Sequence, residues 1–218
     1  MKGIPRTQKN LYVVFSATPY RMGRAIRMVT HFEYNHVALA LSETGPLYSF
    51  ARKYGNVPLC GGFVEESPLR YRNRGRRARI FVCRIPVTEE QYAAVVHKLN
   101  AIKRQQQRYV YNLYSAAAAP LHRRIALPRS FTCVEFAVAL LAEGGILRSE
   151  ETGRFWSISA LMARLAPFEI YQGPFPKQEN PRWKNDSFPC HKGHVAAVAL
   201  TSFALGRLTA RFLQKKLK

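Results

Sequence analysis

Residues 129–141 read RSFTCVEFAVALL, a stretch in which a short polar turn passes directly into an apolar run. Ser130 or Thr132 can cap a helix here, and the glycine pair that follows the apolar run is typical of a helix end. We therefore expect a helix over residues 132–143, with Cys133 in its first turn. The positive end of a helix favours the thiolate form of such a cysteine, and its unpaired N–H groups can hold an oxyanion. The same position also suits a small buried side chain that only packs, as most free cysteines do.

Strands and helices alternate in the chain before this segment. Residues 11–16 are rich in β-formers and predict a buried first strand, and Thr18 followed by Pro19 predicts the start of a helix. Residues 36–41 and 47–51 predict a hairpin, because turn-forming residues separate two apolar runs. We expect an α+β fold in which an antiparallel sheet packs against the helix that carries the cysteine.

The middle of the chain supplies further elements. Residues 61–62 predict a Gly-Gly turn, residues 70–79 a basic loop and residues 78–84 a strand. Thr88 and Gln91 have the spacing of a capping box at the start of a long amphipathic helix. After the cysteine helix, FWSISALMARL predicts a shorter helix and FEIYQGPF predicts a strand.

The last part of the chain differs in composition from the rest. Residues 176–194 are polar, contain proline and have no period, which predicts a linker after a domain formed by residues 1–175. Residues 195–218 have apolar residues at helical spacing beside lysines and arginines, which predicts a basic amphipathic helix. No window reaches the roughly 18 apolar residues of a membrane span, so we expect this helix to lie on a membrane surface. A helix docked on its own domain is the equal alternative.

Charge and cysteine content limit the class of protein. The 218-residue chain has 34 Lys and Arg against 13 Asp and Glu, and its net charge of +21 attracts nucleic acid or an anionic lipid surface. Its four cysteines form no CxxC pair, which is typical of reduced thiols in the cytoplasm. The apolar run at residues 11–15 is shorter than the roughly 7–15 residues of a signal-peptide core. The expected location is cytoplasmic and peripheral to a membrane.

Cys133 needs a positioned base, and a third group that orients that base, to act as a nucleophile. Among six histidines, His36 is the best candidate because it begins the otherwise apolar strand in NHVALAL. A strand-edge histidine with satisfied hydrogen bonds is the alternative. The metal-ligand side chains of CHKGH, residues 190–194, lack a fourth ligand at zinc spacing. We therefore expect no metal and no cofactor.

Three segments occur in the order found in a known superfamily. VVFSATPYRMGRAIRMVTHFEYNHVALAL, LYSFAR and FTCVEFAVALL together resemble the circularly permuted papain-like hydrolases of the NlpC superfamily, which include lecithin:retinol acyltransferase and uncharacterised bacterial relatives. The resemblance covers roughly residues 11–147. It implies a permuted papain-like fold, with Cys133 as nucleophile and His36 as general base. It also implies peptidase, amidase, lipid acyltransferase or thioesterase chemistry.

The third catalytic position departs from the pattern of that superfamily. Relatives have His or Glu on the strand paired with the histidine strand, where this chain has Tyr48 and Ser49. We expect Ser49 to orient His36, because Tyr48 more easily serves as core. Neither side chain carries a charge at pH 7, so a weak or specialised enzyme is expected. The residues expected to contact or gate the substrate are Glu135, Thr132 and Tyr34.

These patterns predict a cysteine hydrolase or acyltransferase that attacks an amide or ester bond of a peptide, amide or lipid-acyl substrate. The alternative is a nucleic-acid-binding or non-catalytic binding protein on a degenerate hydrolase scaffold. The basic tail and a cluster of arginines favour an anionic membrane surface as partner over nucleic acid. The arginines expected to bind anions are Arg70, Arg72, Arg74, Arg76, Arg77 and Arg79.

Overall fold

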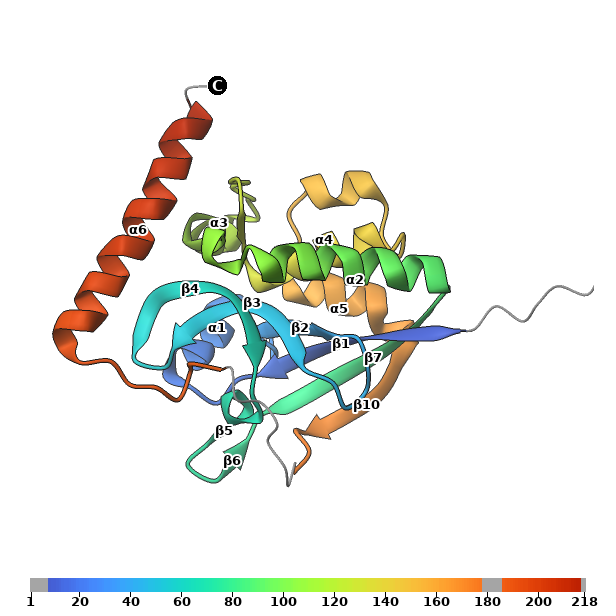
Figure 1. Cartoon of the computed structure of the whole chain (residues 1–218). Helices are drawn as coiled ribbons and strands as arrows, with labels where there is room; N and C mark the ends of the chain where they lie inside the picture. Colours follow the sequence, from blue (N-terminus) through green and yellow to red (C-terminus); the bar gives the residue numbers. More distant parts are fainter. Residues whose placement is uncertain (1–7, 178–185, 217–218) are drawn as a thin grey trace, which may run out of the picture.

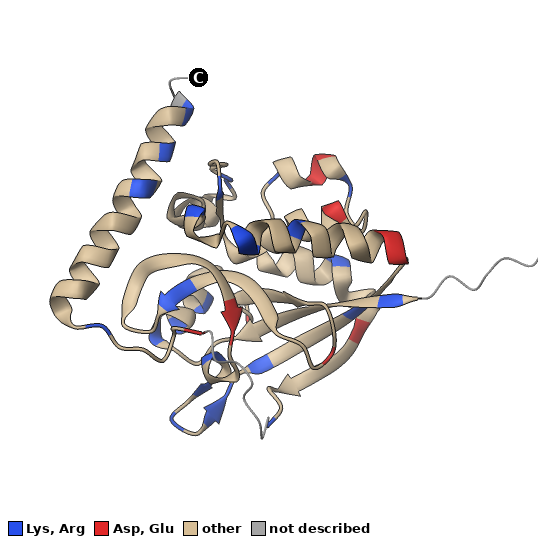
Figure 2. Ribbon diagram, in the orientation of Figure 1, with Lys and Arg blue, Asp and Glu red and all other residues tan. Residues whose placement is uncertain are grey.

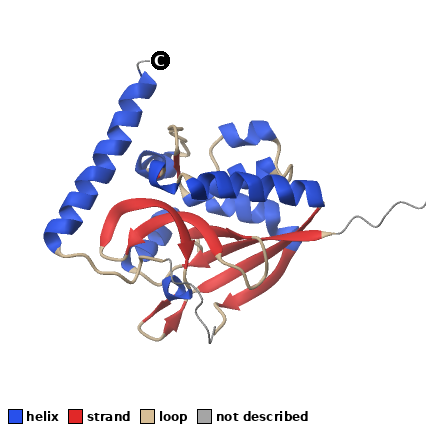
Figure 3. Ribbon diagram, in the orientation of Figure 1, coloured by secondary structure: helices blue, strands red, loops and turns tan. Residues whose placement is uncertain are grey.

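An antiparallel sheet of six strands forms the centre of the molecule, with the strands in the order β10-β7-β1-β2-β3-β4 (Figure 1). The structure is a computed structural model that describes residues 8–177 and 186–216. Helices pack against the sheet, so the predicted α+β class with an antiparallel sheet is confirmed (Figure 3).

The bounds of the elements follow the order of the chain. The strands of the main sheet are β1 (Lys9–Ala17), β2 (His36–Ala40), β3 (Leu47–Tyr54), β4 (Val57–Glu66), β7 (Arg79–Val87) and β10 (Glu169–Pro174). Two small sheets consist of β5 (Arg72–Asn73) with β6 (Arg76–Arg77), and of β8 (Val110–Tyr111) with β9 (Ser130–Phe131). The α-helices are α1 (Arg21–Thr30), α2 (Glu89–Arg104), α3 (Leu113–Ala118), α4 (Cys133–Glu143), α5 (Ile158–Leu165) and α6 (His194–Lys216).

The main core lies between the sheet and the helices. β1 carries Leu11, Val13 and Phe15 on its core face, and all three are fully buried. Successive side chains of a strand point to opposite faces, so Val14 lies on the other face, where a smaller cluster with Ile80 covers it. β1 is therefore apolar on both faces, and the buried first strand predicted from the sequence is confirmed.

α4 is apolar around most of its circumference because other elements surround it. α2 and α5 pack beside it, and β2 and β3 lie against it (Figure 1). The ring of Phe136 contacts those of Phe50 and Phe63, with centroid distances of 5.1 and 5.9 Å. Full burial of one such side chain contributes roughly 1.5–3 kcal/mol. These contacts fix the start of α4, and with it Cys133, relative to the sheet.

Two helix starts follow their sequence patterns and a third does not. Thr88 and Thr132 each cap a helix through a capping box. α1 begins at Arg21, so the prediction that Thr18 is its N-cap is wrong. The backbone N–H of Thr18 instead donates to Oδ1 of Asn35 at 2.9 Å, and its Oγ1 accepts from Nδ2 of Asn35 at 2.8 Å. This pair joins the end of β1 to the residue that precedes β2.

The two glycines expected to form a turn lie inside β4 instead. A Cβ atom on Gly61 would stand 2.7 Å from Cβ of Tyr111 and 3.0 Å from the carbonyl oxygen of Ala51, closer than packed atoms approach. Glycine at this position therefore allows β8 to pack closely against β4. β4 continues through both glycines as far as Glu66.

The segment predicted as a basic loop forms a short hairpin of β5 and β6. Its two-residue turn consists of Arg74 and Gly75, whose φ angles are +48° and +76°. Positive φ at both positions is what a type I′ turn requires, and the twist of that turn matches the twist of paired strands. The hairpin extends away from the main sheet, on the side opposite α2 and α4 (Figure 1).

The segment before α6 packs back on the domain. Asp186 accepts two hydrogen bonds from the guanidinium group of Arg70, both at 2.7 Å. The N–H group of Gly55 donates to the carbonyl oxygen of Phe188 at 3.0 Å. The described part of the predicted linker is therefore held by specific contacts, while residues 178–185 of that prediction lie outside the described residues.

α6 has a docked face and an outward face. Leu208 is buried against the domain, and Arg207 and Arg211 donate to backbone carbonyl oxygens near β8 and β9. The outward face consists of the exposed residues from Val195 to Leu213, and none of these is charged. By length and composition α6 is able to cross a membrane, which the sequence pattern did not predict.

Candidate active site

Cys133 is the first residue of α4, directly after the N-cap Thr132. In the capping box, the N–H of Glu135 donates to Oγ1 of Thr132 at 3.2 Å, and the N–H of Thr132 donates to Oε2 of Glu135 at 2.7 Å. The N–H groups of Cys133 and Val134 have no acceptor within the helix, because they precede its first i→i−4 hydrogen bond. Both are available to bind an oxyanion beside the thiol.

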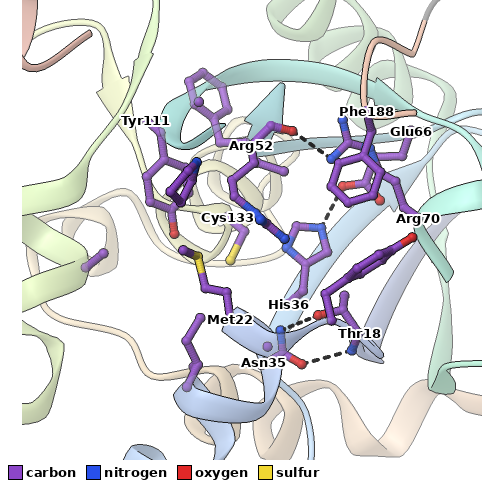
Figure 4. A pocket seen from close by; sticks show the side chains of 18 of the residues that line it. Thr18, Met22, Asn35, His36, Arg52, Glu66, Arg70, Tyr111, Cys133 and Phe188 are labelled. Carbon is purple, nitrogen blue, oxygen red and sulfur yellow. Dashed lines mark hydrogen bonds and ion pairs between the residues drawn. The ribbon is translucent and has the colours of Figure 1, made fainter. Parts of the chain in front are cut away.

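His36, the first residue of β2, lies next to this thiol. His36 and Cys133 line the same cavity, whose volume is about 220 Å³. Figure 4 shows the Cys133 sulfur beside the imidazole ring. The fold thus brings together the two residues that the sequence predicted as nucleophile and base.

A buried carboxylate on the far side of the imidazole completes the arrangement. Oε1 of Glu66, at the end of β4, lies 2.6 Å from Nε2 of His36. Because Nε2 makes this contact, Nδ1 is the ring nitrogen left for Cys133. The hydroxyl of Ser49 donates to the same carboxylate oxygen, and the hydroxyl of Tyr71 donates to the other one. Three side chains therefore hold Glu66, which is 2% exposed, in one orientation.

The charges of this pair stabilise each other. Burial lowers the pKa of His36, but the charge of Glu66 and hydrogen bonds with Cys133 and Glu66 outweigh burial and raise that pKa well above 6.5. Burial also raises the pKa of Glu66, whereas the charge and hydrogen bond of His36 and the charge of Arg70 outweigh it and lower that pKa well below 4.5. An imidazole with high proton affinity suits a base that must accept a proton from a thiol.

The group that contacts His36 differs from the one predicted. Ser49 is fully buried and hydrogen-bonds Glu66, so it supports the carboxylate that stands beside the imidazole. Tyr48 lies in the core, where its ring stacks on that of Phe63 at 6.1 Å, as expected for the less suitable candidate. The expectation of an uncharged third group is therefore wrong for the structure.

The sequence does contain a signal for Glu66, in the segment FVEESP at the end of β4. Alternation along a strand places its two glutamates on opposite faces. Glu65 accepts from Nζ of Lys103 at 2.7 Å, and Glu66 points to His36. A turn at residues 61–62 would end the strand before Glu65 and Glu66. The predicted turn therefore left no strand in which the two glutamates could alternate.

The residues predicted to contact or gate the substrate have other partners. Thr132 and Glu135 close the capping box, and Glu135 also accepts from Oγ of Ser115 at 2.8 Å, which ties α3 to α4. Tyr34 is 2% exposed and its hydroxyl accepts from Nε2 of Gln172 at 3.0 Å. Tyr34 is therefore a core residue, and it is not among the residues that line the cavity around Cys133.

Apolar side chains form much of the wall of this cavity. Met22 and Ile26 of α1 line one side, and Phe188 lines it from the segment before α6. Tyr111 of β8 also lines the cavity and is drawn near Cys133 in Figure 4. Burial, together with the nearby Cys133, raises the pKa of the Tyr111 hydroxyl, which therefore remains a hydrogen-bond donor.

The arginines predicted to bind anions have different environments. Arg70 is buried and paired with Asp186, so the prediction is wrong for this residue, whose charge is neutralised inside the protein. Arg79 pairs with Glu33 at 3.2 Å, and Arg72 is half-buried. The exposed members on the hairpin are Arg74, Arg76 and Arg77, and Figure 2 shows basic segments and no acidic one in the hairpin.

The other cysteines differ from Cys133 in their surroundings. Burial raises the pKa of Cys60, and it raises the pKa of Cys83 to about 12, so both thiols stay protonated near neutral pH. Cys190 is exposed in the segment before α6. Within residues 8–177 and 186–216, no group of three or more His, Cys, Asp or Glu side chains is placed to hold a metal ion.

Comparison of the chain with protein-family models, curated proteins and solved structures gives no match. The evidence for a function is therefore the arrangement of three side chains, those of Cys133, His36 and Glu66. A thiol at the start of α4, an imidazole at the start of β2 and a buried carboxylate at the end of β4 come together in this α+β domain.

We predict that Glu66→Gln lowers the pKa of His36. The substitution removes the charge that opposes burial, and loss of an opposite charge within about 4–6 Å changes a pKa by about 1–3. NMR titration of the His36 Cε1–H signal should show a protonated ring through pH 8 in the wild type and a ring that loses its proton at lower pH in the variant. Glu65→Gln is the matched control, because Glu65 pairs with Lys103. Equal titration of His36 in both variants would contradict the assignment.

Proposed function

We propose that the protein is a cysteine hydrolase or acyltransferase of the permuted papain-like class, acting on an amide or ester bond. Cys133 is the nucleophile, His36 the base and Glu66 the residue that orients the base. The observation that carries this proposal is the 2.6 Å contact between Oε1 of Glu66 and Nε2 of His36, in the cavity that His36 shares with Cys133. The resemblance of three ordered segments to the NlpC superfamily supports the same class.

Before the substrate is attacked, Nδ1 of His36 takes the proton of the Cys133 thiol and keeps it, so the resting site is a thiolate–imidazolium pair. The thiolate attacks the substrate carbonyl carbon, a C–S bond forms, and the carbonyl π electrons move to oxygen. The N–H groups of Cys133 and Val134 stabilise that oxyanion. When the tetrahedral intermediate collapses, the bond to the leaving alcohol or amine breaks and His36 donates its proton to the leaving group.

In the second step, water or an acceptor alcohol or amine attacks the thioester on Cys133. His36 accepts a proton from the attacking group, and collapse of the second intermediate releases the thiolate and restores the resting pair. Glu66 stays ionised throughout and stabilises the imidazolium form of His36. Attack by water gives hydrolysis and attack by another nucleophile gives transfer, so one site supports both reactions.

The surroundings of the site support an apolar acyl substrate near a membrane. Met22, Ile26 and Phe188 line the cavity next to Cys133. The outward face of α6 is uncharged although the chain carries +21, because Arg207 and Arg211 are turned toward the domain. We place this face against the lipid of a membrane at the cytoplasmic side, with α6 lying on the surface.

We predict that Cys133 is the most reactive of the four thiols toward iodoacetamide below the ~8.5 at which a free thiol ionises. Transfer of its proton to His36 supplies the thiolate that reacts. Site-resolved mass spectrometry across a pH series should therefore find alkylation of Cys133 at pH 6–7, and loss of this reaction in His36→Ala.

Three internal controls sharpen this measurement. Cys190 reports the rate of an exposed thiol. Cys60 and Cys83 report local unfolding, because both are buried and, unlike the buried Cys133, neither lines the cavity beside His36. A Cys133 that reacts no faster than Cys190 at pH 6–7 would contradict the proposed nucleophile. Reaction of Cys133 together with Cys60 and Cys83 would indicate unfolding in place of activation.

We predict that Val198→Glu/Phe203→Glu abolishes flotation of the protein with neutral phosphatidylcholine vesicles. These two side chains on the outward face of α6 are 66% and 65% exposed, and burial of an apolar side chain in lipid contributes roughly 1.5–3 kcal/mol. Leu121→Glu/Ile170→Glu adds the same charges at two other exposed apolar positions and should leave flotation intact. Equal loss in both double variants would refute a specific role of α6.

A further inference from the structure

A second concave site lies on the far side of α1 from the cavity around Cys133. Its volume is about 450 Å³, and it is lined from the start of α1 and from the β5–β6 hairpin. We call it the arginine groove. Its lining residues are Pro19, Arg21, Arg24, Asn73, Arg74 and Arg76.

Charge is the distinguishing property of the arginine groove. Four of its six lining residues are exposed arginines and none is acidic, so the groove concentrates like charges that repel one another. The positive end of α1 lies at the same place and adds to the attraction for an anion. Guanidinium groups donate paired hydrogen bonds whose geometry matches phosphate oxygens.

The fold holds the two sides of the groove together. The hydroxyl of Tyr20 donates to the carbonyl oxygens of Leu69 and Arg72 at 3.0 and 2.9 Å, which fixes the hairpin to the start of α1. In the hairpin turn, Arg74 has a φ of +48°, a conformation more usual for Asn or Gly. The arginines from two separate elements therefore face one space in the folded protein without any movement of the backbone.

α1 separates the arginine groove from the proposed active site. Arg21 and Arg24 face the groove, whereas Met22 and Ile26 line the cavity next to Cys133. A helix with its side chains is about 10–12 Å across, so the two sites are about one helix width apart. The later part of α1 exposes Met28 and Val29, which are 73% and 61% accessible. One helix thus presents basic residues to the groove and apolar residues to solvent.

We infer that the arginine groove binds the phosphate group of an anionic lipid headgroup. Phosphate matches the four guanidinium groups, and the exposed apolar side chains of α1 and the outward face of α6 suit the adjoining acyl region of a lipid layer. Nucleic acid fits less well, because no lining residue of the groove is aromatic and none offers a surface for base stacking. The site does not depend on Cys133 and stands apart from the proposed catalysis.

The test compares charge-matched variants of the full chain. Arg21→Gln/Arg74→Gln removes one arginine from each side of the groove, and Arg104→Gln/Arg164→Gln removes the same charge from exposed positions on α2 and α5. Calorimetric titration with soluble dihexanoylphosphatidic acid should show binding about tenfold or more weaker in the groove variant, and unchanged in the control. The same result is expected in a Cys133→Ala background.

Two further titrations identify the source of the phosphate. Inorganic phosphate should bind more weakly than dihexanoylphosphatidic acid, because it lacks the acyl contacts to α1; equal binding of the two would overturn the lipid assignment. A single-stranded oligonucleotide should bind with the same affinity in the groove variant and the control. Greater loss of oligonucleotide binding in the groove variant would overturn the lipid assignment in favour of nucleic acid. Equal binding of dihexanoylphosphatidic acid by the groove variant and the control would overturn the site itself.

Discussion

The buried ion pair of His36 and Glu66 is the interaction on which the rest of the site depends. It joins β2 to β4 across β3, so the imidazole is held from a strand that is not its neighbour in the sheet. Removing two charges from water costs several kcal/mol per ion, and apolar residues would fill the same space without that cost. Hydrogen bonds from Ser49 and Tyr71 to the carboxylate offset part of this cost. A fold that retains such a pair beside a thiol is more easily explained by chemistry than by stability.

The thiol reaches this pair because α4 begins at a fixed point. Thr132 and Glu135 close the capping box, while Phe136 packs against aromatic rings of the sheet. The cap uses the N–H groups of Thr132 and Glu135, and it leaves the two between them for a ligand. One sequence motif thus ends the preceding turn, positions the sulfur and leaves two N–H groups at the helix start without an acceptor in the helix. Thr132 and Glu135 therefore lie next to the site because they hold the start of α4 in place.

Local patterns in the sequence predicted most elements of the fold. The capping boxes at Thr88 and Thr132, the apolar first strand and the C-terminal helix all depend on short-range rules, and the structure has each of them. Cys133 was a candidate because it follows a helix cap, and His36 because it begins an otherwise apolar strand; the structure places both in the lining of one cavity. The start of α1 was placed too early, since the pairing of Thr18 with Asn35 is set by β1 and β2.

Glu66 was not predicted, because the alternation in FVEESP has meaning only if the strand continues past Gly61 and Gly62. The position of Glu66 depends on β4 continuing through Gly61. Glycine at this position does not form a turn; it allows close packing against Tyr111. The arginines illustrate the same limit: Arg70 belongs to an ion pair with Asp186, more than a hundred residues later in the chain. Charge clusters in sequence become binding sites only where the fold exposes them together.

If the proposed function is right, Cys133, His36 and Glu66 act as one unit. The most direct test is the rate of acyl-enzyme formation from p-nitrophenyl butyrate, measured from the p-nitrophenol burst and from the intact mass of the adduct. We expect one butyryl group on Cys133, formed roughly 10²-fold or more slowly in His36→Ala and in Glu66→Gln, with no further loss in the double variant. An adduct on another residue, or additive losses in the double variant, would contradict it.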